Sequence, residues 1–294
     1  MKTVSDKTRG TLLTIAGVIV LSPDALLISS VSVDTWTLVF WRGLLTAATL
    51  TVSLIVVHGK GTLREGFRIG IPGFFVGVFF AASTISFVTS VRMTTAANTL
   101  VIVAAMPLVA AVFTRVFLGE KVPVRTWAAV VIGFSGIGLV FSGSLAGGSP
   151  LGDLLALATA FLMAANFVII RRFKKVNMIP AVVLSGLMTT FLTGFLVNPV
   201  PLSTSDIFLL TVIGTVVLPV PLAVMTVSPK LIPAAEVSLI MLLETFLGPF
   251  WVWLALAERP EMETVLGGSI LIFTLVVHAW AGMGKSGNRA SSVI

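Results

Sequence analysis

A few ionisable side chains lie inside apolar stretches of this chain that are long enough to cross a membrane. Asp24 and Arg42 lie in the first two of these stretches, and Glu244 lies near the centre of a later one. A charged side chain at the bilayer centre costs roughly 2.5–3.5 kcal/mol on insertion scales, so each of these residues is a functional candidate. Apolar surroundings favour the protonated form of a carboxyl group. We therefore expect Glu244 to bind either a proton or a cationic amine, or else to be a carboxylic acid hydrogen-bonded to a neighbouring helix.

Asp24 and Arg42 are expected to pair with each other. The helical rise of about 1.5 Å per residue places both side chains roughly 10 Å below the outer membrane surface, with Asn98 near the same level. The pair could belong to an outer gate, or it could be a permanent link between two neighbouring helices. Asn98 could equally serve as an interhelical hydrogen-bonding group.

Asp24, Arg42 and Asn98 form a first polar layer. The two halves of the chain resemble each other, as described below, and the equivalent positions in the second half predict a second polar layer toward the cytoplasmic side. Its members are Asn166, Ser185 and Glu236. They could form an inner gate. Alternatively, Asn166 could be a simple interhelical hydrogen-bonding residue, and Glu236 could extend to the membrane interface.

Aromatic and proline residues add two weaker groups of candidates. Three aromatic residues could stack on flat substrates or could face lipid, namely Trp41, Phe75 and Phe79. Proline removes a backbone hydrogen bond inside a helix, so prolines within spans could act as hinges or could be packing kinks. The hinge candidates are Pro23, Pro107 and Pro249.

The overall composition excludes most other classes of protein. Of the 294 residues, 56% are hydrophobic and only 11% are charged, whereas a soluble domain has about 25% charged residues. A soluble enzyme and a disordered chain are both excluded. The chain has no cysteine and two histidines, and no catalytic cluster or metal motif is evident. We therefore expect no enzymatic activity, no cofactor and no metal site.

The apolar stretches predict an all-α integral membrane protein with ten transmembrane helices, because each stretch has about the 20 residues that a span requires. The expected spans are 10–29, 34–57, 66–90, 94–118, 124–143, 150–172, 179–197, 205–228, 232–256 and 260–281. Basic residues concentrate on one side when the spans alternate, and loops rich in Lys and Arg stay cytoplasmic. Both termini are therefore expected in the cytoplasm. The excess of Lys and Arg over Asp and Glu is explained by their place in the cytoplasmic loops, so no nucleic-acid partner is expected.

The two halves of the chain resemble each other. Ala96-Ala97, an apolar stretch and Leu118-Gly119-Glu120 recur as Ala234-Ala235, an apolar stretch and Leu256-Ala257-Glu258, displaced by 138 residues at both ends. Five spans per half would invert the second copy, an arrangement typical of secondary transporters. We expect one repeat over residues 1–148 and a second, inverted repeat over residues 149–294.

These features resemble the drug/metabolite transporter superfamily, in its ten-span bacterial branch with two EamA repeats. The resemblance is carried by the paired Ala-Ala motifs, the Gly-Glu and Ala-Glu motifs, and the Trp41-Arg42 pair in span two. It implies movement of small metabolites, frequently export of amino acids or drug-like compounds. It also implies a cavity formed mainly by spans 1–4 and 6–9, and it identifies no substrate.

The functional expectation is a secondary active transporter in a bacterial inner membrane that works by alternating access. It would export small amino-acid-like or amine-like metabolites or drugs, with the proton as a candidate coupling ion. Its partners would be the substrate and the lipid bilayer, and it would be a monomer or a homodimer. The alternatives are an uptake carrier or exchanger for a nucleotide-like metabolite, a non-transporting membrane protein, and an intramembrane enzyme.

Overall fold

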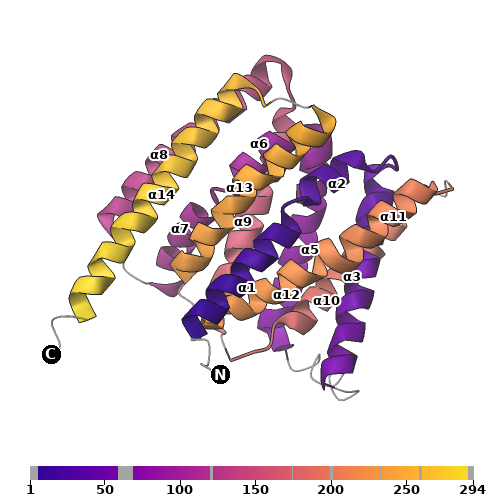
Figure 1. Ribbon diagram of the computed structural model, residues 1–294, viewed down its shortest axis with the longest axis horizontal. Helices are drawn as coiled ribbons and strands as arrows, with labels where there is room; N and C mark the ends of the chain where they lie inside the picture. Colours follow the sequence, from indigo (N-terminus) through magenta and orange to yellow (C-terminus); the bar gives the residue numbers. More distant parts are fainter. Residues whose placement is uncertain are drawn as a thin grey trace.

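The computed structural model shows a bundle of helices, and no strand occurs in the part of the chain that it describes. Both chain ends lie at one end of the bundle, and the α8–α9 turn lies at the opposite end, which we call the distal end (Figure 1). The described residues are 6–58, 69–119, 122–173, 175–198, 201–231, 234–257 and 260–290, without the side chains of 6–7, 58, 146–147, 229–230, 234–239, 242 and 279–290.

The described part of the first half of the chain contains seven α-helices, because two of its spans are each divided into two helices. They are α1 (Asp6–Leu21), α2 (Asp24–Ser30), α3 (Thr35–His58), α5 (Gly70–Met93), α6 (Ala96–Val103), α7 (Met106–Leu118) and α8 (Val124–Gly147). The second half begins directly afterwards. Its helices are α9 (Pro150–Arg172), α10 (Ile179–Gly194), α11 (Thr204–Val212), the π-helix η2 (Ile213–Val217), α12 (Pro219–Leu231), α13 (Ala234–Leu256) and α14 (Met262–Ala290).

Seven helical segments of the described chain are long and apolar enough to cross a membrane. They are Thr8–Ser30, Thr35–Val57, Gly70–Met93, Ala96–Leu118, Val124–Leu145, Pro150–Arg172 and Thr204–Ser228. Shorter apolar helices occupy the other three expected spans, at Ile179–Gly194, Leu243–Leu256 and Met262–His278. The prediction of a helical, multi-pass membrane protein is confirmed, whereas the count of ten membrane-crossing helices stays a prediction.

Proline marks most of the interruptions in these spans. Pro23 separates α1 from α2, and Pro107 is the second residue of α7, just after the break that follows α6. Pro249, by contrast, lies inside α13, which continues through it. The helices are thus interrupted beside the first two prolines and continuous through the third, and the role of all three as hinges stays a prediction. The π-helix η2, which precedes Pro219, was not anticipated.

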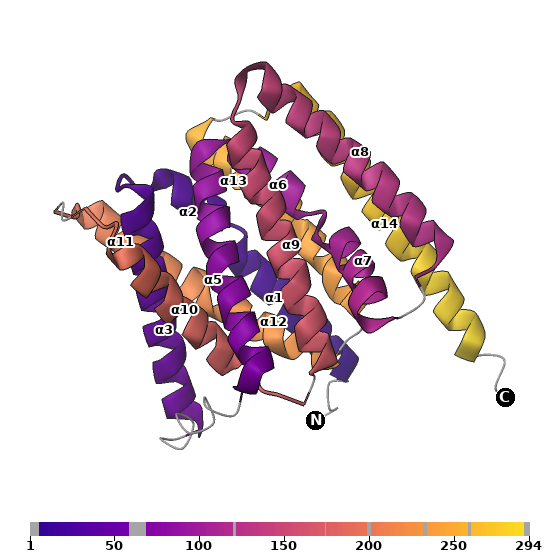
Figure 2. The same cartoon turned by 180° about the vertical axis from the view of Figure 1, so that it is seen from behind.

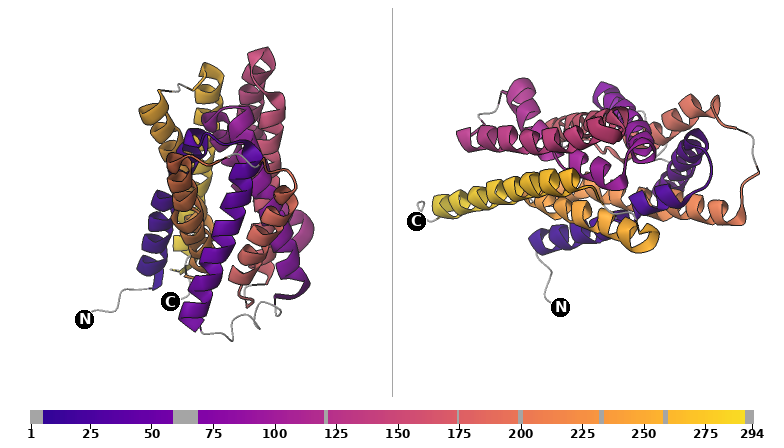
Figure 3. Two further views of the ribbon diagram at one scale, coloured as in Figure 1. Left: turned by 90° about the vertical axis from the view of Figure 1, so that its right-hand side faces the viewer. Right: turned by 90° about the horizontal axis from the view of Figure 1, so that it is seen from above.

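Two helix pairs cross at glycines, where the backbones come close together. A Cβ atom added at Gly43 of α3 would lie 2.8 Å from the carbonyl oxygen of Gly186 in α10, and one at Gly186 would lie 2.7 Å from the carbonyl oxygen of Gly43. Gly136 of α8 and Gly267 of α14 approach each other in the same reciprocal way. Figures 2 and 3 show α8 and α14 running side by side along one edge of the bundle.

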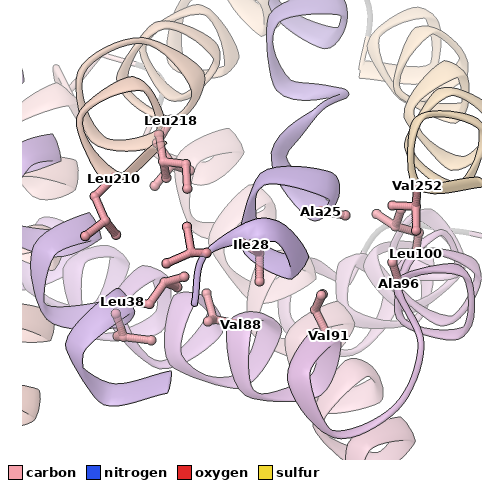
Figure 4. Packing of buried hydrophobic residues seen from close by; sticks show 13 residues of the cluster. Ala25, Ile28, Leu38, Val88, Val91, Ala96, Leu100, Leu210, Leu218 and Val252 are labelled. Atoms are coloured by element: carbon pink, nitrogen blue, oxygen red, sulfur yellow. The ribbon is translucent and has the colours of Figure 1, made fainter. Parts of the chain in front are cut away.

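The short helix α2 lies in the largest buried apolar cluster. Ala25 and Ile28 of α2 are packed among side chains from α3, α5, α6, α11 and α13 (Figure 4). This packing holds α2 in place although it has only seven residues. It thereby fixes the position of Asp24, the first residue of α2.

Candidate functional site

A buried ion pair links α2 to α3. Two oxygens of the Asp24 carboxylate accept hydrogen bonds from the Arg42 guanidinium, from Nη1 at 2.6 Å and from Nη2 at 2.7 Å. Each side chain has less than a twentieth of its surface exposed, and Nε of Arg42 is buried without a hydrogen-bond partner. The expected pairing of Asp24 with Arg42 is thus present, and its role as a gate stays a prediction.

Glu244 of α13 lies close enough to this pair to interact electrostatically with both Asp24 and Arg42. Protein surrounds the carboxyl group and desolvates it, yet the residue as a whole is only half-buried. The three residues come from α2, α3 and α13, so the first and second halves of the chain meet here. We call Asp24, Arg42 and Glu244 the central cluster.

A hydrogen bond fixes α13 against the break between α1 and α2. Trp251 lies two helical turns after Glu244, so both side chains lie on similar faces of α13. The indole Nε1 of Trp251 donates to Oγ of Ser22 at 3.0 Å. The helix that carries Glu244 is therefore tied to the residues immediately before Asp24.

Asn98 does not join Asp24 and Arg42; it lies in a separate hydrogen-bonded cluster at the distal end. Its Nδ2 donates to Oγ1 of Thr94 at 3.3 Å and to Oγ of Ser144 at 3.2 Å. Its Oδ1 accepts a hydrogen bond from Thr264, and Ser144 donates to Oδ2 of Asp153 at 2.6 Å. We call these five residues the distal cluster. Asn98 was expected at the level of Asp24, but its face of α6 points toward α8, α9 and α14.

The two members of the expected inner layer whose side chains are described, Asn166 and Ser185, have different hydrogen-bond partners. With its amide oriented to satisfy both polar atoms, Asn166 of α9 donates to the carbonyl of Val76 and accepts from the amide of Phe80, both at 3.2 Å, so it links α9 to α5. Ser185 donates to the carbonyl of Val182 in its own helix. The side chain of Glu236 lies outside the described residues. Asn166 thus has the interhelical role that was its alternative interpretation.

The three expected aromatic residues contact other apolar side chains. Phe75 is exposed and packs against Phe79 of the same helix, with ring centroids 6.1 Å apart. Trp41 packs against the apolar cluster around α2 and makes an edge contact with Phe40. A role for Phe75 and Phe79 in stacking on substrate has no support from these contacts.

Two acidic residues matter in the structure although the sequence analysis did not select them. Asp153 is a member of the distal cluster, and Asp206 accepts hydrogen bonds from the backbone and side chain of Ser32 at 2.8 and 2.7 Å. Arg92 donates to the carbonyl oxygens of Val31 and Val33 in the same loop. Both acids lie in the first turn of a helix. Asp153 is the fourth residue of the expected span 150–172, and Asp206 is the second residue of the expected span 205–228. An acidic residue inside the start of an apolar span was the signal that could have revealed them.

Among the described residues, no group of three or more His, Cys, Asp or Glu side chains could hold a metal ion. The central cluster offers a desolvated carboxyl group at Glu244 and, at Arg42, a buried guanidinium Nε without a hydrogen-bond partner.

Residues 8–142 match the EamA-like transporter family. The EamA-like segment holds Asp24, Arg42 and Asn98, and Glu244 lies outside it. A protein of known crystal structure has a similar fold, with a TM-score of 0.64 and 16% sequence identity over 92% of this chain and 98% of that chain. No curated protein matches the chain. Nearly the whole chain therefore shares its fold with that protein, whereas the family match is confined to residues 8–142.

Proposed function

We propose that this protein is a secondary active transporter that exports small amino-acid-like or amine-like metabolites or drugs by alternating access. The central cluster is the observation that carries the proposal. It brings charged groups from both halves of the chain together at a helix break, inside apolar spans where an ionisable group is otherwise costly. The match of residues 8–142 to a transporter family supports the same function.

The packing of the helices supports two inverted repeats over residues 1–148 and 149–294. A two-fold axis that exchanges the halves would convert the contact of α3 with α10 into itself, and likewise that of α8 with α14, and both pairs pack closely. The same exchange converts the contact of α5 with α9 into the contact of α12 with α1, which also occurs. Two halves of similar shape, opposed across the membrane, favour two states open to opposite sides.

The charges of the central cluster support a cationic or zwitterionic substrate. Asp24 and Arg42 neutralise each other through two short hydrogen bonds. The carboxyl group of Glu244 has no such partner in the described structure, so it is the group available to an ammonium ion or a proton. A substrate carboxylate could accept a hydrogen bond from the unpartnered Nε of Arg42.

The distribution of basic residues supports cytoplasmic termini in a bacterial inner membrane. At the end of the bundle that holds the termini, helix ends or adjoining turns carry Arg9, Arg125, Arg171, Arg172 and Lys175, whereas Arg92 is at the distal end. Retention of basic residues on the cytoplasmic side would place the distal end outside.

The test is a thermal-shift screen of purified protein with amines and amino acids, beside the variant Glu244→Gln. A ligand that binds only the folded protein, at a hundredfold over its Kd, stabilises it by about 2.7 kcal/mol. We expect such ligands to raise the unfolding temperature of the wild type and not that of Glu244→Gln. Glu261→Gln is the matched control, because Glu261 is exposed at the start of the last helix.

Equal shifts in the wild type and Glu244→Gln would show that Glu244 does not bind the substrate. Counterflow in proteoliposomes then separates the classes of membrane protein. A carrier exchanges labelled for unlabelled ligand with saturable kinetics, whereas a channel or an intramembrane enzyme does not. Absence of saturable counterflow for every stabilising ligand would overturn the transporter proposal.

A further inference from the structure

The hydroxyl group of Thr46 in α3 is buried without a hydrogen-bond partner. Only 4% of the Thr46 surface is exposed, and its Oγ1 is without a partner among the described residues. A helical threonine often donates to the carbonyl oxygen four residues earlier. Other threonines of the described helices do so, namely Thr14, Thr51, Thr159, Thr190, Thr193, Thr211, Thr215 and Thr274. Thr46 does not, and a buried polar atom without a partner calls for a physical reason.

Thr46 lies one helical turn after Arg42, on the same face of α3. Residues four apart in a helix have Cβ atoms about 5–6 Å apart. Their side chains lean toward the helix N-terminus, so the side chain of Thr46 lies over the turn that carries Arg42. Nε of Arg42 is also buried without a partner, because the bonds to Asp24 use only Nη1 and Nη2. Two hydrogen-bond donors therefore stand unused within one turn of α3.

This face of α3 is directed to the interior of the bundle. Gly43 meets the backbone of α10, and Leu45 packs against η2. With about 3.6 residues per turn, Arg42 and Thr46 lie between these two contacts. Glu244 of α13 interacts electrostatically with Arg42. The two unused donors thus lie on the side of α3 that also faces the carboxyl group of Glu244.

We propose that Thr46 is a substrate-binding residue, and that its hydroxyl group and Nε of Arg42 together bind a carboxylate group of the substrate. A carboxylate has two oxygens that only accept hydrogen bonds, and both protein groups donate. Hydrogen bonds to a charged acceptor are stronger than neutral ones. Binding of the carboxylate thus satisfies two buried donors that have no partner within the described protein.

This inference rests on the proposed function and narrows its substrate class to zwitterions. A simple carboxylate would bring an uncompensated negative charge next to Asp24 in an apolar setting, which is costly. A zwitterion brings its own ammonium group, for which Glu244 is the available acceptor. The substrate is therefore expected to carry a carboxylate and an ammonium group a few bonds apart, as an amino acid does.

The first measurement needs no ligand. Thr46→Val keeps the shape of the side chain and removes only the hydroxyl group. Because Oγ1 has no partner among the described residues, we expect Thr46→Val to unfold at the same temperature as the wild type or at a higher one. A clearly lower unfolding temperature, or failure to fold, would show that the hydroxyl group has a structural role and would overturn the proposal.

The second measurement compares ligands with and without a carboxylate. Thermal shifts are titrated with amino acids and with the amines that lack only the carboxyl group, such as leucine beside 3-methylbutylamine. A hydrogen bond to a charged group contributes about tenfold to a hundredfold in affinity. We expect Thr46→Val to lose about tenfold or more in affinity for the amino acid and to bind the matching amine as the wild type does.

Two further variants separate the hydroxyl group from the shape of the side chain. Thr46→Ser retains a hydroxyl group and should retain most of the affinity for the amino acid. Thr51→Val is the matched control in the same helix, because the Thr51 hydroxyl group donates to the carbonyl oxygen of Ala47 at 2.7 Å. It should bind both ligands as the wild type does.

The outcomes distinguish this proposal from the proposed function. Equal affinity of the wild type and Thr46→Val for every amino acid that binds would overturn the role of Thr46 and leave the transport proposal intact. Binding of amines alone would do the same. If neither series binds to the wild type, the role of Thr46 is overturned as well, and counterflow decides the transport proposal by itself.

Discussion

At the scale of single residues, the central cluster combines a satisfied pair with an unpaired acid. Burial of Asp24 and Arg42 is tolerated because two hydrogen bonds join them, and removal of one partner leaves an uncompensated charge in an apolar setting. Glu244 has no such ion-pair partner in the described structure. The two kinds of group therefore differ in how substitution should affect stability and function.

Replacement of Arg42 alone should destabilise the protein strongly. Arg42→Met leaves the carboxylate of Asp24 buried without its partner, and the expected loss is about 3–5 kcal/mol in the free energy of unfolding. The double variant Asp24→Leu with Arg42→Met should recover most of this loss. Chemical denaturation in detergent measures both, and a double variant no more stable than Arg42→Met would contradict the explanation.

The same double variant separates the two interpretations of the pair. If Asp24 and Arg42 form a permanent link between α2 and α3, a folded double variant should keep its counterflow activity. If the ion pair breaks and re-forms during transport, the folded double variant should lose that activity, because no ion pair then closes the outer gate.

At the scale of elements, glycine sets how closely α3 and α10 approach. A methyl group at position 186 would lie 2.7 Å from the carbonyl oxygen of Gly43 and 2.9 Å from Cβ of Ala47, and neither can move without shifting α3. Gly186→Ala should therefore cost about 1–3 kcal/mol of stability. Thermal unfolding in detergent provides the measurement.

Gly138→Ala is the matched control for this substitution. Gly138 lies inside α8, and an added Cβ would have no atom within 4 Å. Alanine is a better helix former than glycine by up to about 1 kcal/mol, so this variant should be as stable as the wild type or more so. If both variants lose the same stability, the close contact at Gly186 is not the cause.

The sequence predicts the elements better than their orientation. Hydropathy locates the apolar helices because each needs about 20 such residues, and proline chemistry anticipates the breaks near Pro23 and Pro107. The rotation of α6 about its axis is not encoded in hydropathy, because membrane helices are apolar on most faces. For this reason the sequence predicted only that Asn98 lies near the level of Asp24, and its bond to Ser144 was not foreseen.

Asp24 and Arg42 were paired correctly from sequence because adjacent antiparallel helices place side chains at equal depth next to each other. Glu244 could be selected as an isolated acid, but its proximity to this pair depends on how α13 crosses α2. Contacts between spans that are far apart in the sequence are therefore the part of the site that could not be predicted from the sequence alone.

At the scale of the whole molecule, the two ends of the bundle differ in charge and in hydrogen bonding. The distal end is closed by the distal cluster and by Asp206 and Arg92, which hold the loop between α2 and α3. The opposite end carries both termini and most of the described basic residues. The unequal distribution of basic residues predicts a single orientation in the membrane, with the distal end outside.

This orientation can be measured directly with single cysteines in intact cells. Ser205→Cys, at the distal end, should react with a membrane-impermeant thiol reagent before the cells are permeabilised. Lys175→Cys, in the exposed turn between α9 and α10 at the opposite end, should react only afterwards. The physical reason is the unequal distribution of Lys and Arg, since translocation of basic loops is disfavoured. Labelling of position 175 in intact cells, with position 205 protected, would show the opposite orientation, with the termini outside.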